Sequence, residues 1–363
     1  MKLAFIIDKP QTFQIVAGQL FESLRRGHIC NLFCIFEKDA LGGFLTPDIS
    51  NAISEGRLIW RKFNNKKAAI LSLEATANEY DAVLGINFFN SSWTDIYNSS
   101  QTKSYSFEYC WNEMYNQTPH FEKKTGSLFC NTNVSKNVIH AVSGFEGVST
   151  GSPWYELLDK HSSVEKNKII TILQPHNSLY GVDSNILPAF IELTKFLQEW
   201  CSLNDFELIL KSRKKYKSLN SFMYPGKRIW DENAYDHIDL YSKSSLVFHF
   251  CSSAINELSF LKTPNIAVAP GVQKRLHPTT IHAPGIKRIH ERYYSGDIFD
   301  NNHYEQASLK DTLDLTTSVG QNRMNEKMLS LIKGKKDWHS FQQKSFPGEH
   351  IGSTKRILDI IEG

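Results

Sequence analysis

Residues 246–257 read LVFHFCSSAINE, and this stretch decides the predicted fold. The run that ends at Phe250 has the length of a strand and predicts one that is buried on both faces. Ser252 and Ser253 follow where the strand ends, and a segment with helical character begins directly after them. A strand, a short polar turn and a helix in this order form the repeating unit of a parallel α/β sheet. We therefore predict an α/β domain with a polar turn at one edge of its sheet.

The polar turn suits a nucleotide diphosphate. Free backbone N–H groups and the positive end of a helix attract phosphate, and the hydroxyls of Ser252 and Ser253 can add hydrogen bonds. Glu257 lies four residues after Ser253 on the same face of the predicted helix, where it can accept hydrogen bonds from ribose hydroxyls. The plainer alternative is a serine that caps the helix and a glutamate that faces solvent.

The same alternation runs through the chain in two halves. In the first half, strands are predicted near residues 2–8, 28–36, 57–63, 82–86, 103–107 and 138–142, with helices at 11–26 and 66–80. In the second half, strands are predicted at 168–173, 206–210, 246–250 and 265–269, with helices at 186–201, 234–241 and 254–261. This pattern predicts parallel sheets that are covered on both faces.

A Gly/Ser-rich cluster at 144–153 (GFEGVSTGSP) separates the two halves. We expect two Rossmann-like domains, residues 1–150 and 165–335, that face each other across a cleft. Two amphipathic segments within 338–363 are expected to form helices that return to the first domain. Ligands of open parallel sheets bind outside the carboxyl ends of the strands, so the cleft is the expected site of chemistry.

Composition narrows the classes of function. The chain has 363 residues, 41% of them hydrophobic, and no stretch approaches the roughly 20 apolar residues of a membrane span. The first eight residues, MKLAFIID, read as a buried strand and not as a signal peptide, which indicates the cytoplasm. A net charge of +3 is too small to indicate nucleic acid. No Cys-x-x-Cys, Asp-x-Asp or Gly-x-Gly-x-x-Gly occurs, so we expect no metal and no cofactor.

The second half resembles glycosyltransferases of the GT-B type. Ser252-Ser253-x-x-x-Glu257, followed by Pro264 and an apolar strand, is similar to their donor loop. The resemblance is closest to CDP-glycerol glycerophosphotransferase-like and UDP-N-acetylglucosamine 2-epimerase-like proteins. Residues 235–244 (YDHIDLYSKS) resemble the helix that leads into the donor strand, and 352–361 (GSTKRILDII) resemble the closing helix. At the joint between domains, Glu156 stands one place after the usual acid.

The resemblance implies a donor site in the second domain. His176 ends the first strand of that half, where epimerase-like proteins often carry His-Arg, but Asn177 replaces the arginine here. Lys211 and Arg213 end the next strand, where related families often carry a Lys-x-His-Pro or Lys-Pro-His element. This chain has Lys211-Ser212-Arg213 at that place, and its His-Pro, His277-Pro278, lies in a later loop. The expected donor-binding residues are His176, Lys211, Arg213, Ser252, Ser253 and Glu257.

The catalytic base is expected in the first domain. An inverting transferase needs a carboxylate or histidine there to take the proton of the acceptor hydroxyl. Glu108 follows an apolar strand and has aromatic neighbours such as Tyr105 and Phe107, which raise its pKa and stack on sugar rings if they line the site. The same aromatic residues fit a protein core equally well. Asp8, which otherwise caps a helix, and His120 are the other candidates.

The leading hypothesis is a glycosyltransferase that moves a sugar from a nucleotide-sugar donor to a growing bacterial surface polysaccharide, O-antigen or capsule. The acceptor is then a glycan or a lipid-linked glycan, which allows peripheral association with the inner membrane. A UDP-sugar 2-epimerase-like isomerase is the first alternative, although that family's Asp-Ser-Gly-Gly loop is missing. A CDP-glycerol- or ribitol-type polyol-phosphate transferase is the second, and a partner subunit without catalytic activity is the third. The oligomeric state is left open.

Overall fold

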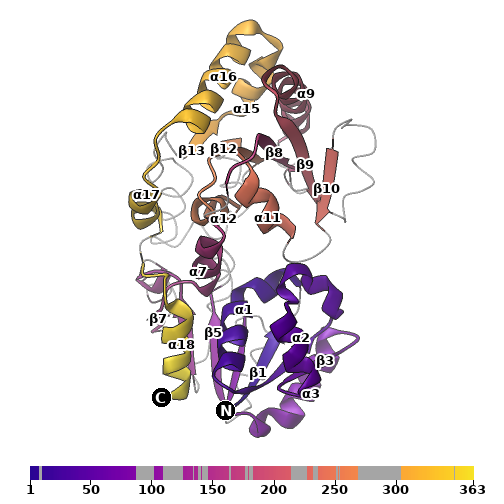
Figure 1. Cartoon of the computed structure of the whole chain (residues 1–363), viewed down its shortest axis with the longest axis vertical. Helices are drawn as coiled ribbons and strands as arrows, with labels where there is room; N and C mark the ends of the chain where they lie inside the picture. Colours follow the sequence, from indigo (N-terminus) through magenta and orange to yellow (C-terminus); the bar gives the residue numbers. More distant parts are fainter. Residues whose placement is uncertain are drawn as a thin grey trace. The chain divides into compact units, whose positions relative to one another are not determined.

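The computed structural model divides the chain into two compact units. It describes residues 1–7, 10–86, 102–108, 126–133, 135–137, 140, 146–162, 165–175, 179, 183–213, 227–231, 236–250, 252, 254–268, 304–346 and 348–363. The first unit consists mainly of Met1–Leu157 and Phe346–Gly363, and the second mainly of Leu158–Glu232 and His237–Ser345. Figure 1 shows the elements of each unit by label.

Within the described residues, the first unit contains a seven-stranded parallel sheet of order β3-β2-β1-β4-β5-β6-β7. Its strands are β1 (Lys2–Ile7), β2 (Ile29–Cys34), β3 (Leu58–Lys62), β4 (Ala82–Ile86), β5 (Lys103–Phe107), β6 (Gly126–Cys130) and β7 (Val148–Ser149). Its helices include α1 (Pro10–Arg25), α2 (Pro47–Ser54), α3 (Lys66–Thr76), α7 (Pro153–Lys160), α18 (Ser353–Glu362) and the 3₁₀ segments η1 (Lys38–Phe44) and η2 (Ala77–Glu79). Because neighbouring strands are parallel, the chain must return to the same edge of the sheet between one strand and the next.

The described part of the second unit contains a six-stranded parallel sheet of order β10-β9-β8-β11-β12-β13. Its strands are β8 (Ile169–Leu173), β9 (Glu207–Arg213), β10 (Lys227–Asp231), β11 (Leu246–Phe250), β12 (Asn265–Val268) and β13 (Tyr304–Ala307). Its helices include α9 (Ile186–Asn204), α11 (Asp236–Lys243), α12 (Ala254–Phe260), α15 (Leu309–Leu313), η7 (Asp314–Thr316), α16 (Ser318–Lys333) and α17 (Trp338–Ser345). The predicted class, two parallel-sheet α/β domains, is confirmed.

One face of the second sheet forms an apolar core. Phe248 of β11 and Ile266 of β12 pack with Phe190 of α9 and with Met324 and Met328 of α16. The opposite face of the same two strands carries smaller and polar side chains, among them His249 and Asn265, both buried. Because side chains alternate along a strand, His249 and Asn265 lie on the face opposite the apolar core.

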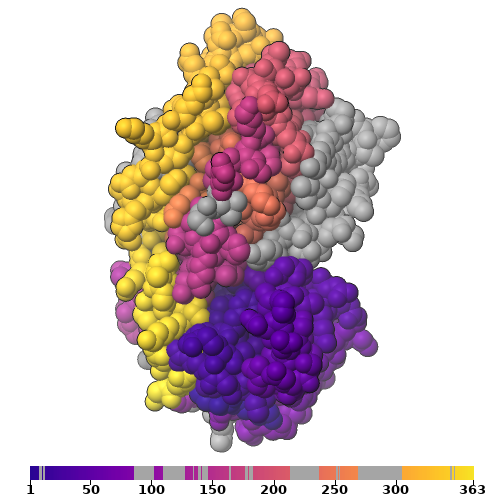
Figure 2. All heavy atoms as spheres, in the orientation of Figure 1, coloured from indigo at the N-terminus to yellow at the C-terminus, as the bar shows by residue number. Residues whose placement is uncertain are grey.

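The two C-terminal helices belong to different units. Helix α18 packs against α1, and the two lie side by side in Figures 1 and 2. Ion pairs from Arg26 to Asp359 (2.9 Å) and Glu362 (2.7 Å) add to the apolar contact of α18. Helix α17 contacts α12 in the second unit, where Gln342 Nε2 donates to the Ser259 carbonyl at 3.0 Å.

Within the first unit, the segment before α7 is fastened to the segment before α18. The Ser152 N–H donates to Nδ1 of buried His350 at 3.0 Å, and the His350 Nε2–H donates to the Phe346 carbonyl at 3.0 Å. Gly151 has φ +80°, and a Cβ there would lie 2.1 Å from the Glu349 carbonyl oxygen. This close approach therefore requires glycine.

Glu156, the acid that the sequence places one position late at the joint, caps α18. Its Oε2 accepts hydrogen bonds from the Thr354 N–H at 3.0 Å and from Ser353 Oγ at 3.2 Å. A carboxylate at the amino end of a helix satisfies free N–H groups and is favoured by the helix dipole. Glu156 therefore has a structural role in the first unit.

Lys166 joins the carboxyl-terminal ends of two helices of the second unit. Its Nζ donates to the Ser242 carbonyl (2.6 Å) at the end of α11, and to the Leu261 carbonyl (3.1 Å) and Thr263 Oγ1 (2.6 Å) just after α12. Burial, and to a smaller extent the nearby charge of Lys262, lower the pKa of this lysine to about 7. The three oxygen acceptors call for three N–H donors, which only the charged ammonium provides.

Candidate functional site

The carboxyl edge of the second sheet carries three of the six residues that were predicted to bind a donor. Lys211 lies near the end of β9, and Ser252 follows the end of β11. Glu257 lies in the first turn of α12, the helix that begins after β11. In a parallel sheet these strand ends meet on one side, which is where open α/β sheets bind ligands.

A chain of contacts runs from Lys211 to Glu257. Lys211 Nζ lies 5.4 Å from the centroid of the Tyr241 ring, within cation–π range. The Tyr241 ring meets the His237 ring edge-on, with centroids 5.5 Å apart. His237 Nε2 lies 3.5 Å from Glu257 Oε2, so the two pair when the imidazole is protonated. His237 and Tyr241 are four residues apart on α11 and therefore share one face of that helix.

His249 of β11 accepts a hydrogen bond from the backbone of Ser252, the described residue between β11 and α12. This histidine is 1% exposed, its Nε2 lies 3.1 Å from Asn265 Oδ1, and its Nδ1 accepts a hydrogen bond from the Ser252 N–H at 3.3 Å. Ser252 Oγ in turn accepts a hydrogen bond from the Ala254 N–H at 3.2 Å, as a helix-capping serine does. Burial lowers the pKa of His249 to about 4, so the ring is neutral at physiological pH.

The predicted donor residues are thus described in part. Lys211, Ser252 and Glu257 lie at the same edge of the second sheet. Arg213 is the last residue of β9, and its side chain is outside the description. His176 and Ser253 lie outside the described residues.

Glu108 follows β5 in the first unit and is 2% exposed. Its Oε2 accepts from the Asn131 N–H at 2.7 Å, and its Oε1 accepts from Ser135 Oγ at 2.9 Å. Burial raises the pKa of Glu108 to about 7, although both hydrogen bonds act in the opposite direction. The carboxylate therefore holds the turn after β6 and is poised to change protonation near neutral pH. Asp8 and His120 lie outside the described residues.

The aromatic residues before Glu108 belong to the core. Tyr105 stacks on Phe129 with centroids 5.5 Å apart and rings 3° from parallel, and Phe107 packs against the same ring. Tyr105 and Phe107 are 4% and 2% exposed. They therefore desolvate the end of β5 and contribute to the core, which is the second of the two roles that the sequence left open.

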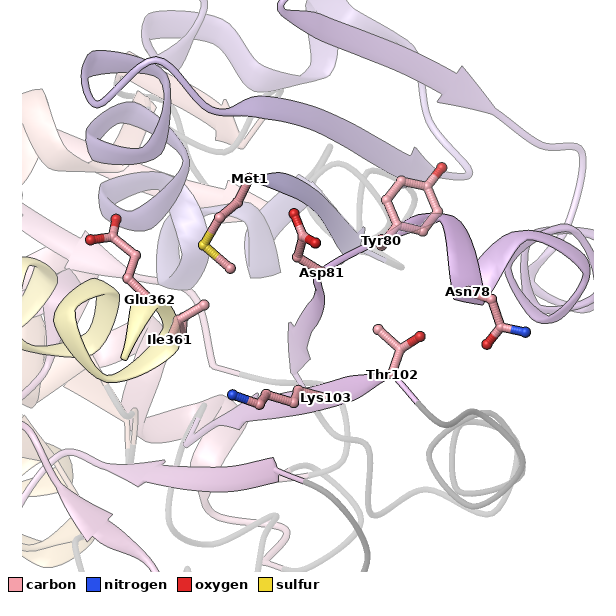
Figure 3. A pocket seen from close by; sticks show the side chains of 8 residues that line it. All are labelled: Met1, Asn78, Tyr80, Asp81, Thr102, Lys103, Ile361 and Glu362. Atoms are coloured by element: carbon pink, nitrogen blue, oxygen red, sulfur yellow. The ribbon is translucent and has the colours of Figure 1, made fainter.

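An open hollow of about 760 Å³ lies at the opposite, amino edge of the first sheet. Met1, Asp81 and Lys103 line it, and each stands at or just before the start of a strand (Figure 3). Glu362 closes one side, and its carboxylate pairs with Arg26 and His28. None of the predicted site residues lines this hollow, and we do not assign the site to it.

The sequence analysis missed His237, Tyr241, His249 and Asn265 as parts of the site. A signal was present for two of them, because a histidine and a tyrosine four residues apart mark one face of the predicted helix before the donor strand. A second signal was the single ionisable residue, His249, within an apolar strand. Nothing in the sequence pairs His249 with Asn265, since their contact depends on the neighbouring positions of β11 and β12.

No group of three or more His, Cys, Asp or Glu side chains in the described residues is placed to hold a metal ion. No helix in the described part of the chain is long and apolar enough to cross a membrane.

Solved GT-B structures match the chain over its whole length. The UDP-GlcNAc 2-epimerase from Neisseria meningitidis, bound to UDP-GlcNAc, has a TM-score of 0.60 at 11% identity, with 100% of each chain covered. The enzyme of the same name from Methanocaldococcus jannaschii, in complex with UDP-GlcNAc and UDP, has a TM-score of 0.60 at 12% identity, covering 100% of this chain and 99% of that one.

The wall teichoic acid polymerase TagF has a TM-score of 0.57 at 12% identity over 99% of this chain and 88% of its own. No protein-family model and no curated protein sequence matches the chain. Likeness at this level of identity establishes the fold and leaves the activity open. The chain has the GT-B fold, as the sequence resemblance predicted.

Proposed function

We propose that the chain is a nucleotide-sugar enzyme that binds its donor at the carboxyl edge of the second sheet. The observation that carries the proposal is the grouping of Lys211, Tyr241, His237 and Glu257 beside the turn at Ser252. A lysine and a capped helix start suit a diphosphate, and a half-buried carboxylate suits ribose hydroxyls. The solved relatives whose names include UDP-GlcNAc or UDP add support, since their fold is the same.

Within this class we propose a glycosyltransferase that extends a bacterial surface polysaccharide such as O-antigen or capsule. The acceptor is a glycan or lipid-linked glycan, which the enzyme meets in the cytoplasm or at the cytoplasmic face of the membrane. The leaving diphosphate is stabilised by Lys211 and the amino end of α12, and this arrangement needs no metal. The turn Cys251-Ser252-Ser253 differs from the Asp-Ser-Gly-Gly loop of epimerase-like proteins, which favours transfer over epimerisation.

Glu108 and Asp8 are the proposed bases for the acceptor hydroxyl. Each oxygen of Glu108 accepts one hydrogen bond, from the Asn131 N–H and from Ser135 Oγ. An ionised carboxylate has further lone pairs, so it can accept the proton of the acceptor hydroxyl while these two bonds hold it in place. A pKa of about 7 suits this role, since a base is most effective when its pKa is near the working pH.

A UDP-sugar 2-epimerase-like isomerase is the second candidate. It is favoured by the two epimerase structures that match this chain from end to end. A polyol-phosphate transferase of the CDP-glycerol type has similar support from TagF.

Product analysis separates the three candidates. The full chain is incubated with UDP-GlcNAc and other UDP-, GDP-, CMP- and dTDP-linked sugars and with CDP-glycerol, each with and without a glycan acceptor. A glycosyltransferase releases nucleotide only when the acceptor is present, and the acceptor gains one sugar. An epimerase converts UDP-GlcNAc at C2 without acceptor, and a polyol-phosphate transferase releases CMP from CDP-glycerol. Acceptor-independent epimerisation, or CMP release from CDP-glycerol, would overturn the glycosyltransferase assignment.

A further inference from the structure

The second sheet contains a buried histidine that the chemistry proposed above does not use. His249 lies in β11, a strand in which all five residues are buried, on the face opposite the apolar core. Ala267 of β12 stands beside it in register, and its small side chain leaves room for the imidazole ring. A polar ring in such a place must satisfy both of its nitrogens, because a buried polar atom without a partner is costly.

Both nitrogens of His249 are satisfied, and by different elements. Nε2 faces Asn265 Oδ1 at 3.1 Å, so it carries the proton and donates. Nδ1 is then the lone-pair nitrogen, and it accepts from the Ser252 N–H at 3.3 Å. The ring therefore spans from the start of β12 to the turn after β11. Asn265 selects the tautomer, and that tautomer determines where the Ser252 backbone lies.

Ser252 also contacts the helix that follows. Its Oγ accepts the Ala254 N–H at 3.2 Å and so sets the first turn of α12, which carries Glu257. We propose that His249 and Asn265 form a positioning pair that holds the donor turn in its binding shape through the hydrogen bond from the Ser252 N–H to His249 Nδ1. This inference rests on the proposed function, since the turn is a donor turn only if the chain binds a nucleotide.

The charge state of His249 decides whether the pair works. Burial lowers its pKa to about 4, the hydrogen bond to Asn265 opposes that shift, and no charged group among the described residues contributes. Protonation would place a second N–H on Nδ1, opposite the Ser252 N–H, so that a donor would face a donor. The neutral ring keeps the turn in place throughout the physiological range.

Two substitutions separate positioning from bulk packing. In His249→Asn, the side-chain oxygen takes the place of Nδ1 and still accepts from the Ser252 N–H. In His249→Gln, the amide nitrogen takes the place of Nε2, so the contact with Asn265 is kept and the acceptor for Ser252 is lost. The probe is whichever of UDP, GDP, CDP, dTDP and CMP binds the wild-type chain, with the dissociation constant measured by calorimetry. We expect His249→Asn to bind within about twofold of wild type and His249→Gln to bind about fivefold more weakly, the effect of one hydrogen bond.

A third substitution uses pH. In Asn265→Asp the new carboxylate still accepts from Nε2 and favours the imidazolium, which raises the pKa of His249. The ratio of the variant's dissociation constant to that of wild type cancels the titration of the nucleotide itself. This ratio should rise about fivefold or more between about pH 8 and about pH 5.5, as protonation removes the acceptor.

The results distinguish failure of the donor site from failure of the positioning pair. If the wild-type chain binds none of the five nucleotides, the proposed function fails, and this inference fails with it. If wild type binds but His249→Asn and His249→Gln have equal affinities, the positioning pair is refuted and the donor site stands. If Asn265→Asp folds and its affinity ratio to wild type does not change with pH, the positioning pair is likewise refuted. Thermal unfolding of His249→Asn and His249→Gln is the control: if both lose the same stability, a difference in their nucleotide affinities comes from the hydrogen bond to Ser252 and not from packing.

Discussion

Replacing Glu108 by Gln removes a buried ionisable group and keeps its shape. The pKa of Glu108 is raised from 4.5 to about 7, chiefly by burial. At about 1.4 kcal/mol per pKa unit, this rise corresponds to about 3 kcal/mol. A carboxyl whose folded pKa is raised contributes stability that is fully present below the unfolded pKa of 4.5 and is lost as pH rises through the folded value. The free energy of unfolding of wild type should therefore fall by about 3 kcal/mol relative to Glu108→Gln between about pH 4 and about pH 8.

Urea unfolding at a series of pH values measures this difference. Comparing the variant with wild type at each pH cancels the other titrating groups. Glu74→Gln, which removes an exposed carboxylate on α3, is the matched control and should give a much smaller pH-dependent difference. A stability difference between wild type and Glu108→Gln that stays constant with pH would show that burial does not raise the pKa of Glu108 in the folded chain. A difference that moves in wild type's favour as pH rises would mean that the hydrogen bonds from Asn131 and Ser135 outweigh desolvation.

The same variant tests the proposed base. If Glu108 takes the acceptor proton, Glu108→Gln should lower turnover on the order of 100- to 10,000-fold. Nucleotide affinity should be unchanged, because the proposed donor residues lie in the other unit. Asp8→Asn is the internal control. Loss of turnover in Asp8→Asn but not in Glu108→Gln would reverse the roles, and no loss in either would turn attention to His120 or to a retaining mechanism.

Three further substitutions test the fold and the site. Gly151→Ala should lower the free energy of unfolding by at least about 1–2 kcal/mol, measured in urea, because φ is +80° and the new Cβ meets the Glu349 carbonyl; unchanged stability would contradict that geometry. Lys166→Met should cost about 1–3 kcal/mol in the same assay, because buried oxygens at the ends of α11 and α12 lose their donor. Lys211→Met should weaken nucleotide binding about tenfold or more in calorimetry, the effect of losing a hydrogen bond to a charged group, and an unchanged affinity would remove Lys211 from the site.

The central strands could be predicted because their own residues encode them. The runs at 2–7, 169–173 and 246–250 are mostly apolar and have the length of strands, and all three are strands. The edge strands β10 (KRIWD) and β13 (YEQA) carry charged or polar residues, and they are strands because they pair with β9 and β12. What makes these segments strands is pairing with a neighbouring strand and not a hydrophobic pattern of their own, so they were not predicted from the sequence.

The last described strands of the first sheet, β6 (Gly126–Cys130) and β7 (Val148–Ser149), were not predicted from the sequence. A strand was predicted instead at residues 138–142. Of that span the structure describes residue 140 alone, which is helical, and the other four residues lie outside the described part. The periodicity of a short apolar run does not distinguish a strand from a helix. The sequence of β6, GSLFC, begins with Gly-Ser and contains only a short apolar run, so it gives a weak strand signal.

Part of the candidate site could be proposed from sequence, because its polar residues follow apolar strands. Lys211, Ser252 and Glu257 were identified for this reason, and they share the carboxyl edge of one sheet. The partners that orient them were not, because they depend on packing. His249 and Asn265 are sixteen positions apart and meet only when β11 and β12 pair side by side.

The proposed donor site at the carboxyl edge of the second sheet can be tested by measuring nucleotide binding to the full chain and to two matched lysine variants. The panel is UDP, GDP, CMP, CDP and dTDP, measured by thermal shift and calorimetry on wild type, Lys211→Met and Lys103→Met. Both variants lose one positive charge, but Lys103 lies at the amino edge of the first sheet, in the hollow of Figure 3. At least one nucleotide should stabilise wild type, by about 2.7 kcal/mol at 100 times its dissociation constant. Its affinity should be the same in Lys103→Met and weaker in Lys211→Met. A wild-type chain that binds none of the five, or equal affinities in the two variants, would contradict a donor site at the carboxyl edge of the second sheet.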